Sequence, residues 1–152
     1  ESLYPQNDNI EVVDSVDDDP LEGLDYTLES NYAQNHLHKL KDGRDWTNWY
    51  IDTTNEDIYL SVKFREETTL KGIIITQHQT GPRRENKTIG KMDIYASPDN
   101  VKSYLQGTYE RDKYRGKIYI RFKEPIDVKT LTLKNFKKYN NQYIDTYEIE
   151  FF

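Results

Sequence analysis

DIYLSVKF, residues 57–64, alternates apolar and polar side chains over eight positions. Every second residue from Ile58 to Phe64 is apolar, and the residues between them are Tyr, Ser and Lys. Because successive side chains of a β-strand point to opposite faces, this period of two is typical of a strand with one buried face. The segment therefore predicts a half-buried strand.

The same alternation recurs along the chain, separated by turn-forming residues. We expect further strands in KMDIYAS (91–97), KIYIRFK (117–123), IDVKTLTLK (126–134) and YIDTYEIEFF (143–152), and a more continuously buried one in LKGIIITQ (70–77). The intervening turns are FREETT (64–69), TGPRRENKT (80–88), SPDN (97–100), YRGK (114–117), KEP (123–125) and KKYNNQ (137–142). Short strands at this spacing predict an all-β sandwich or barrel. Only YAQNHLHKLKDG (32–43) favours helix, for one or two turns that end at Gly43.

Composition excludes several classes of function. The 152 residues suit one domain and contain no cysteine, which removes disulfides, thiolate metal sites and cysteine nucleophiles. The net charge of −6 argues against a nucleic-acid partner and against anionic lipid. No apolar run reaches the length of a membrane span, and no segment has the pattern of a signal peptide, so we expect no membrane insertion. The thirteen tyrosines suit strand faces and also wet binding surfaces.

Residues 1–25 differ from the rest, because they are acidic and irregular. The stretch DSVDDDPLEG (14–23) is typical of a solvated linker. Ile10 to Val13 could form a short added strand, although the composition of the whole segment favours a linker. We therefore expect a linker or an N-terminal strand at 1–25, followed by a sandwich domain at 26–152.

Catalytic motifs are absent from the sequence. No nucleophile elbow, dinucleotide-binding turn or phosphate-binding loop occurs. His36 and His38 would need a third ligand such as His78 to bind zinc, and surface histidines explain them more simply. The sequence thus predicts a protein that is not an enzyme.

The loop LKDGRDWT (40–47) places oxygen ligands around a glycine. Asp42, Asp45 and Thr47 have the spacing with which tight loops surround a hard cation such as calcium. The alternative is an Asx turn with a solvated aspartate. Spacing alone leaves both interpretations open.

A second loop, HQTGPRRENKT (78–88), carries hydrogen-bond donors between two predicted strands. Arg83, Arg84 and Asn86 can each donate paired hydrogen bonds to sugar hydroxyls or carboxylates, and His78 belongs to the same loop. A loop of this composition is also often simply solvated.

Taken in order, four segments resemble the discoidin or coagulation-factor C-type domain, a group that includes the family 32 carbohydrate-binding modules of the galactose-binding-like superfamily. They are ESNYAQNHLHKLKDGRDWTNW (29–49), IYLSVKFREETTLKGIIITQH (58–78), GPRRENKTIGKMDIYASPDN (81–100) and TYEIEFF (146–152). The resemblance covers about residues 26–152. It implies an antiparallel jelly-roll β-sandwich of about eight strands. It also implies a structural calcium ion bound by Asp42, Asp45, Thr47, Glu148 and a main-chain oxygen near Leu40.

The resemblance further implies a ligand site on loops at one end of the sandwich. Its candidate residues here are Tyr50, His78, Arg83, Arg84, Asn86, Tyr139 and Tyr143. Galactose-binding members carry a histidine and a second aromatic residue where this chain has Tyr50 and Thr53, so the sugar is expected to differ.

These observations predict a non-catalytic carbohydrate-binding module that belongs to a larger secreted or cell-surface protein, expected to be bacterial and multidomain. It would bind a terminal sugar of a glycan through its end loops. The alternative is a protein- or surface-interaction domain on the same fold, with a surface protein as its partner.

Overall fold

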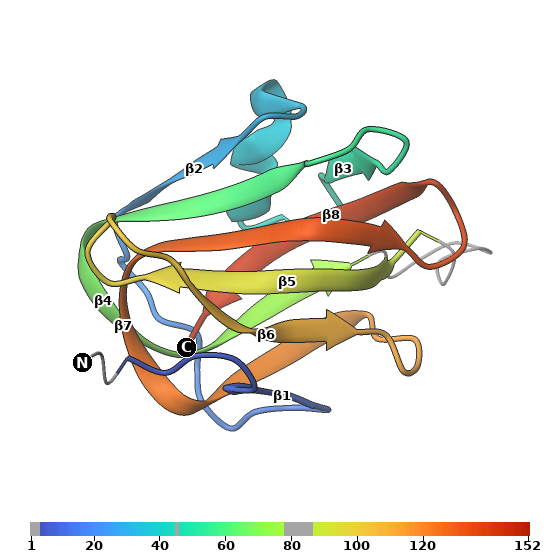
Figure 1. Cartoon of the computed structure of the whole chain (residues 1–152). Helices are drawn as coiled ribbons and strands as arrows, with labels where there is room; N and C mark the ends of the chain where they lie inside the picture. Colours follow the sequence, from blue (N-terminus) through green and yellow to red (C-terminus); the bar gives the residue numbers. More distant parts are fainter. Residues whose placement is uncertain (1–3, 45, 78–86) are drawn as a thin grey trace.

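The computed structural model describes residues 4–44, 46–77 and 87–152, and within them every paired strand is antiparallel (Figure 1). The strands are β1 (Ile10–Val13), β2 (Tyr26–Ser30), β3 (Trp49–Asp52), β4 (Tyr59–Gln77), β5 (Ile89–Ser97), β6 (Tyr104–Glu110), β7 (Lys117–Lys138) and β8 (Tyr143–Phe151), with one 3-10 helix, η1 (Gln34–Lys41). The predicted all-β sandwich is confirmed. The short helical segment before Gly43 is confirmed as well.

Two long strands, β4 and β7, belong to both layers of the sandwich. The first half of β4 pairs with β2 and with the second half of β7, which continues through β5 to β6. The second half of β4 pairs with β8, which carries β3, and with the first half of β7, which carries β1. Both strands fold over at one end of the molecule, which we call the bend end (64–71 and 122–130; Figure 1).

The predicted turns FREETT and KEP are wrong, because both segments continue a strand around this bend. In β4 the pairing register shifts between Lys63 and Thr68, so the strand changes layer without a break in its extended backbone. In β7, Pro125 is exposed and lies where the neighbouring N–H groups bond to Asn9 instead of to β4, so its missing donor is tolerated.

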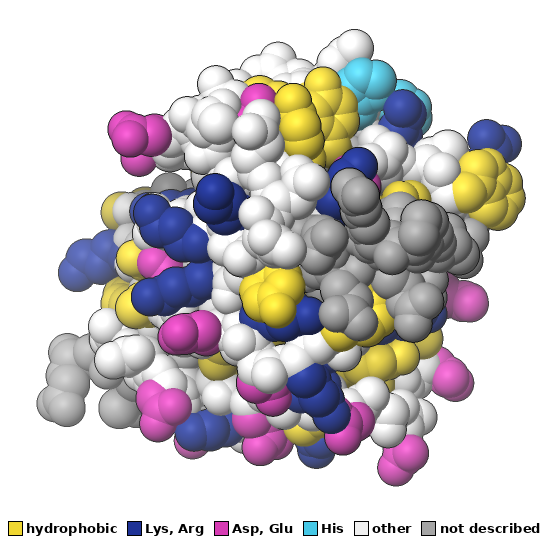
Figure 2. Space-filling view, turned by 90° about the vertical axis from the view of Figure 1, so that its right-hand side faces the viewer, with side chains coloured by type: hydrophobic (Ala, Val, Ile, Leu, Met, Phe, Trp, Pro, Cys, Tyr) yellow, Lys and Arg dark blue, Asp and Glu magenta, His cyan; other side chains and the backbone are white. Residues whose placement is uncertain are grey.

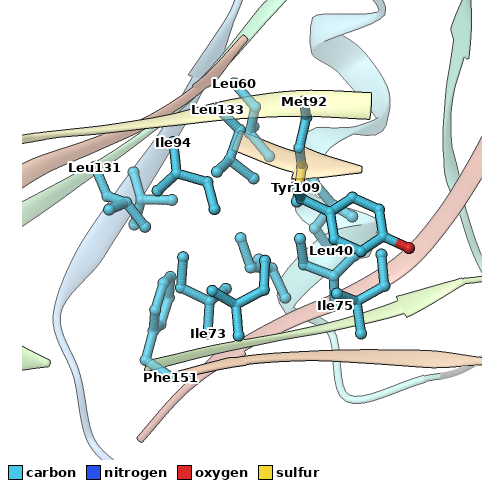
Figure 3. Packing of buried hydrophobic residues seen from close by; sticks show 14 of the residues in the cluster. Leu40, Leu60, Ile73, Ile75, Met92, Ile94, Tyr109, Leu131, Leu133 and Phe151 are labelled. Carbon is cyan, nitrogen blue, oxygen red and sulfur yellow. The ribbon is translucent and has the colours of Figure 1, made fainter. Parts of the chain in front are cut away.

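The core lies between the layers and is almost entirely aliphatic and aromatic. Leu133 and Ile94 from one layer face Ile73 and Phe151 from the other (Figure 3). Gly72 marks a close approach between neighbouring strands of one layer, next to the bend end: a Cβ there would lie 2.3 Å from the Ile120 carbonyl oxygen and from the Phe152 ring. The glycine in LKGIIITQ is therefore required by packing.

Residues 4–25, here called the N-terminal strap, lie against the sandwich. Strand β1 pairs with β7, and the buried side chain of Asn9 donates to the Gln106 side chain (2.8 Å) and accepts from the Glu124 N–H (2.9 Å). Ion pairs join the strap to the sandwich: Asp8–Lys123, Glu11–Arg121, Asp14–Lys113, Asp14–Arg115 and Asp18–Lys71. Of the two expectations for this segment, the added strand is the one observed.

Candidate functional site

The loop after η1 and strand β8 form a polar corner on the outside of the sandwich. Gly43 adopts a left-handed conformation (φ 76°), which turns the chain so that the Arg44 N–H points at two carboxylates. It donates to Asp42 Oδ1 (2.9 Å) and to Glu148 Oε1 (3.0 Å). The Thr47 hydroxyl donates to Asp42 Oδ2 (2.6 Å). Residues 104 positions apart are thus brought together, and the predicted Asx turn at Asp42 is present.

The pKa values of the Asp42 and Glu148 carboxyls shift in opposite directions at this corner. Burial raises the pKa of Asp42, but hydrogen bonds from the Thr47 hydroxyl and the Arg44 N–H outweigh it and hold that pKa below its usual value. Burial and the adjacent Asp42 carboxyl raise the pKa of Glu148 to about 8. At neutral pH the pair therefore keeps a proton on Glu148 and a negative charge on Asp42, which the Arg44 side chain partly offsets.

A hard cation suits this donor set, which consists of carboxylate and hydroxyl oxygens. Leu40, whose main chain is the further expected ligand, lies in the last turn of η1 with its side chain buried. Asp45 lies outside the described residues. Without Asp45, no three His, Asp or Glu side chains among the described residues lie close enough together to hold a metal ion.

The end of the sandwich opposite the bends, here the loop end, collects the connections 53–58, 87–88, 111–116 and 139–142 (Figure 2). On its β3–β8 side the Tyr50 ring touches three others, those of Tyr32 (6.0 Å), His36 (6.4 Å) and Tyr143 (6.3 Å). Tyr50 and Tyr143 are each 38% exposed. An aromatic surface with open rings is the kind on which a sugar ring stacks.

A depression of about 540 Å³ opens beside this aromatic surface. Its apolar lining is Ile51, Ile58 and Phe136. Its polar lining comes from the β3–β4 loop, from the end of β7 and from the β7–β8 turn: Thr53, Thr54, Asn55, Glu56, Asp57, Asn135, Lys137, Lys138 and Gln142. The Thr53 N–H and hydroxyl both donate to the Gln142 carbonyl oxygen (2.8 and 2.7 Å), which fixes one edge.

Tyr139 lies across the loop end from Tyr50 and stacks on an arginine that the sequence analysis did not single out. The Arg111 guanidinium is 3.6 Å from the centre of the Tyr139 ring, which remains 48% exposed. The chain reaches this position because Gly90 has no side chain: a Cβ there would be 2.5 Å from the Lys138 carbonyl oxygen. The Arg111 N–H also donates to the Gly90 carbonyl (2.8 Å).

Comparison with solved structures finds the same architecture in carbohydrate-binding modules. A two-domain protein of unknown function from Bacteroides fragilis matches at TM-score 0.82 and 22% identity, over 95% of this chain and 47% of that one. The first two family 32 modules of Clostridium perfringens ZmpB, solved with GalNAc, match at TM-score 0.76 and 20% identity, over 99% and 40%. The family 32 module of C. perfringens NanJ, solved with galactose, matches at TM-score 0.69 and 18% identity, over 83% and 92%.

The chain has the fold of the family 32 carbohydrate-binding modules. It spans less than half the length of the first two of these structures. No protein-family model and no curated protein matches its sequence.

Within this family 32 fold, the structure brings some of the predicted residues together. Tyr50, Tyr139 and Tyr143 are exposed at the loop end, and Asp42, Thr47 and Glu148 meet at the corner. The predicted ligand residues His78, Arg83, Arg84 and Asn86 lie outside the described residues.

Sequence reasoning missed Arg111 and the polar lining of the depression, because hydrophobic alternation says nothing about which loops meet. It also missed Gln77, whose buried side chain accepts from the Ile89 N–H and donates to the Arg115 carbonyl oxygen, both at 2.8 Å. Gln77 thereby joins the bases of two loops. The two consecutive lysines at the end of β7, Lys137 and Lys138, are the sequence signal that could have indicated the positively charged side of the depression.

Proposed function

We propose that this chain is a non-catalytic carbohydrate-binding module that binds a terminal sugar through its loop end. The observation that carries the proposal is the position of exposed tyrosines beside a polar depression at that one end. Aromatic rings offer flat apolar faces, and the amide, hydroxyl and lysine groups around the depression offer hydrogen bonds to sugar hydroxyls. A shallow site of this kind binds one sugar weakly and gains strength when several modules act together.

The structural neighbours support this proposal. Two of them were solved in complex with galactose or GalNAc. Several of the matching structures come from multidomain chains, so we place this chain in a multidomain, extracellular bacterial protein. In the described part of the chain, no helix has the length and apolar character needed to cross a membrane.

Titration calorimetry against a panel of mono- and oligosaccharides tests the proposal. We expect millimolar to high-micromolar binding of at least one glycan, and Tyr50→Ala should weaken it about tenfold, because the ring centres the aromatic surface. Tyr95→Ala is the matched control, since Tyr95 lies on β5 away from the loop-end connections. If no glycan binds at millimolar concentration, or if both variants lose affinity equally, the proposed site is wrong.

We further propose that calcium binds at the corner, held by Asp42, Thr47 and Glu148, with Asp45 and the main chain near Leu40 as additional ligands. The support is the convergence of two carboxylates and a hydroxyl on one loop. The ion would offset the negative charge of these carboxylates and tie the η1 loop to β8, a structural role that leaves sugar binding to the loop end.

A further inference from the structure

Charge is divided unevenly along this chain. Residues 1–25 contain nine Asp and Glu and no Lys or Arg, whereas residues 26–152 contain all 21 basic residues and the other 18 acidic ones. The chain's net charge of −6 thus combines −9 in the N-terminal segment with +3 in the sandwich. The overall charge says little about any single surface.

The acidic side chains of the strap form their ion pairs away from the depression. Its ion pairs reach Arg65, Lys71, Lys113, Arg115, Arg121 and Lys123. None of these residues lines the depression. The strap therefore offsets the charge of lysines and arginines on other parts of the sandwich. It does not offset the charge of Lys137 and Lys138 at the end of β7.

The lysines at the end of β7 form no ion pair with the part of the chain that the structure describes. Lys137 and Lys138 are exposed and line the depression, and Lys91 pairs in register with Lys137 from the neighbouring strand. Among the described residues, no carboxylate forms an ion pair with any of the three. Figure 2 shows Lys and Arg side chains across the left and centre of this face, with Asp and Glu more numerous in its lower part.

Arg111 is a further cation at the loop end. It forms no ion pair with a described carboxylate, and its buried Nε has no hydrogen-bond partner among the described residues. Tyr139 follows Lys138 directly in the sequence, and its exposed ring stacks on Arg111. Glu56 and Asp57 line the opposite wall of the depression, so a bound anion is expected on the β7 side.

We infer that the ligand at the loop end is an anionic glycan, whose carboxylate or sulfate group meets Lys137, Lys138 and Arg111 while a sugar ring stacks on Tyr139. This inference rests on the proposed carbohydrate-binding function and names its ligand class. Hydrogen bonds from cationic donors to an anionic oxygen are stronger than those to a neutral hydroxyl. None of these three cations forms an ion pair with a described carboxylate. A neutral sugar would offer these cations no anionic group to bind.

The test compares glycans that differ only in charge. Oligogalacturonate and the same oligosaccharide with its carboxylates methyl-esterified are titrated into the full chain at 20 and 300 mM NaCl, together with a sulfated and an unsulfated galactan oligosaccharide. We expect at least one anionic glycan to bind about tenfold more tightly than its neutral counterpart at low salt, and the preference to shrink at high salt. Whichever pair shows the preference identifies carboxylate or sulfate as the anion.

The double variant Lys137→Gln, Lys138→Gln should lose about tenfold in affinity for the anionic glycan and little for its neutral counterpart. Arg111→Gln should act in the same direction. The matched control is Lys102→Gln, Lys129→Gln, which removes the same charge near the bend end, and thermal unfolding verifies that each variant is folded. Equal, salt-independent binding of charged and neutral glycans overturns the inference and leaves the proposed function standing. Binding of none of the four also overturns the inference, and the wider saccharide panel then decides the proposed function separately.

Discussion

At the bend end the polar side chains of the strap find partners inside the molecule, whereas the tyrosines and lysines around the loop-end depression face solvent. The strap's buried Asn9 side chain bonds to Gln106 and to the main chain of Glu124, and Asp8 beside it pairs with Lys123. At the loop end Tyr50, Tyr139 and Tyr143 are the exposed aromatic residues, and Lys137 and Lys138 lack ion pairs among the described residues. Stability and recognition are therefore expected to separate: changes at the bend end should unfold the protein, and changes at the loop end should alter binding alone.

The largest effect on stability is expected from Gly72→Ala. The added Cβ would meet the Ile120 carbonyl oxygen and the Phe152 ring at 2.3 Å, so the neighbouring strands β4 and β7 and the Phe152 ring must shift apart within one layer. Overpacking of this kind costs about 3 kcal/mol of unfolding free energy, measured by urea denaturation. Gly23→Ala is the matched control, because nothing lies within 4 Å of its Cβ position and only its φ of 71° opposes the change, at a cost of about 1 kcal/mol. Equal losses for the two variants would show that the close approach is unimportant.

Asn9→Ala should have the next largest effect. Removing the amide leaves the buried Gln106 side-chain oxygen and the Glu124 N–H without these partners, which costs about 2 to 3 kcal/mol. Gln6→Ala, at an exposed position of the same strap, is expected to stay within about 0.5 kcal/mol. If Asn9→Ala is as mild as Gln6→Ala, the strap is a loosely attached linker and the contrast between the two ends weakens.

This strap also shows what hydrophobic patterning reveals and what it leaves out. Alternation located most of the strands, because each of them buries one face. It did not single out the short strands β2 and β3, nor β6, whose buried positions include Gln106 and Gly107. The acidic strap looked like a linker, since ion pairs to residues about a hundred positions away leave no local pattern. At the corner, spacing identified Asp42 and Thr47, but Glu148 came only from the family resemblance.

The corner lies on the outer face between the two ends and tests the separation in a third way. If calcium binds there, 1 mM CaCl2 should raise the unfolding free energy by about 2 kcal/mol relative to EDTA, as expected for a ligand present at tens of times its dissociation constant. Glu148→Gln should abolish this response, whereas Glu150→Gln, two positions along the same strand, should keep it. A calcium response that is the same in both variants would remove Glu148 from the ligand set. Sugar affinity should change little, because the corner is outside the residues that line the depression.

The smallest effect on stability is expected from Tyr139→Leu, which tests the loop end directly. Leucine keeps apolar volume but removes the ring that stacks on Arg111, and a partly exposed cation–π contact contributes only about 0.5 to 1 kcal/mol. Calorimetric unfolding should therefore shift only slightly, while glycan affinity falls fivefold to tenfold because the sugar loses its aromatic face. Tyr139→Phe keeps the ring and should preserve both properties, so it separates stacking from any role of the hydroxyl. If Tyr139→Leu costs as much stability as Asn9→Ala, the Tyr139–Arg111 pair is a structural element of the sandwich. Stability and recognition are then not separated between the two ends.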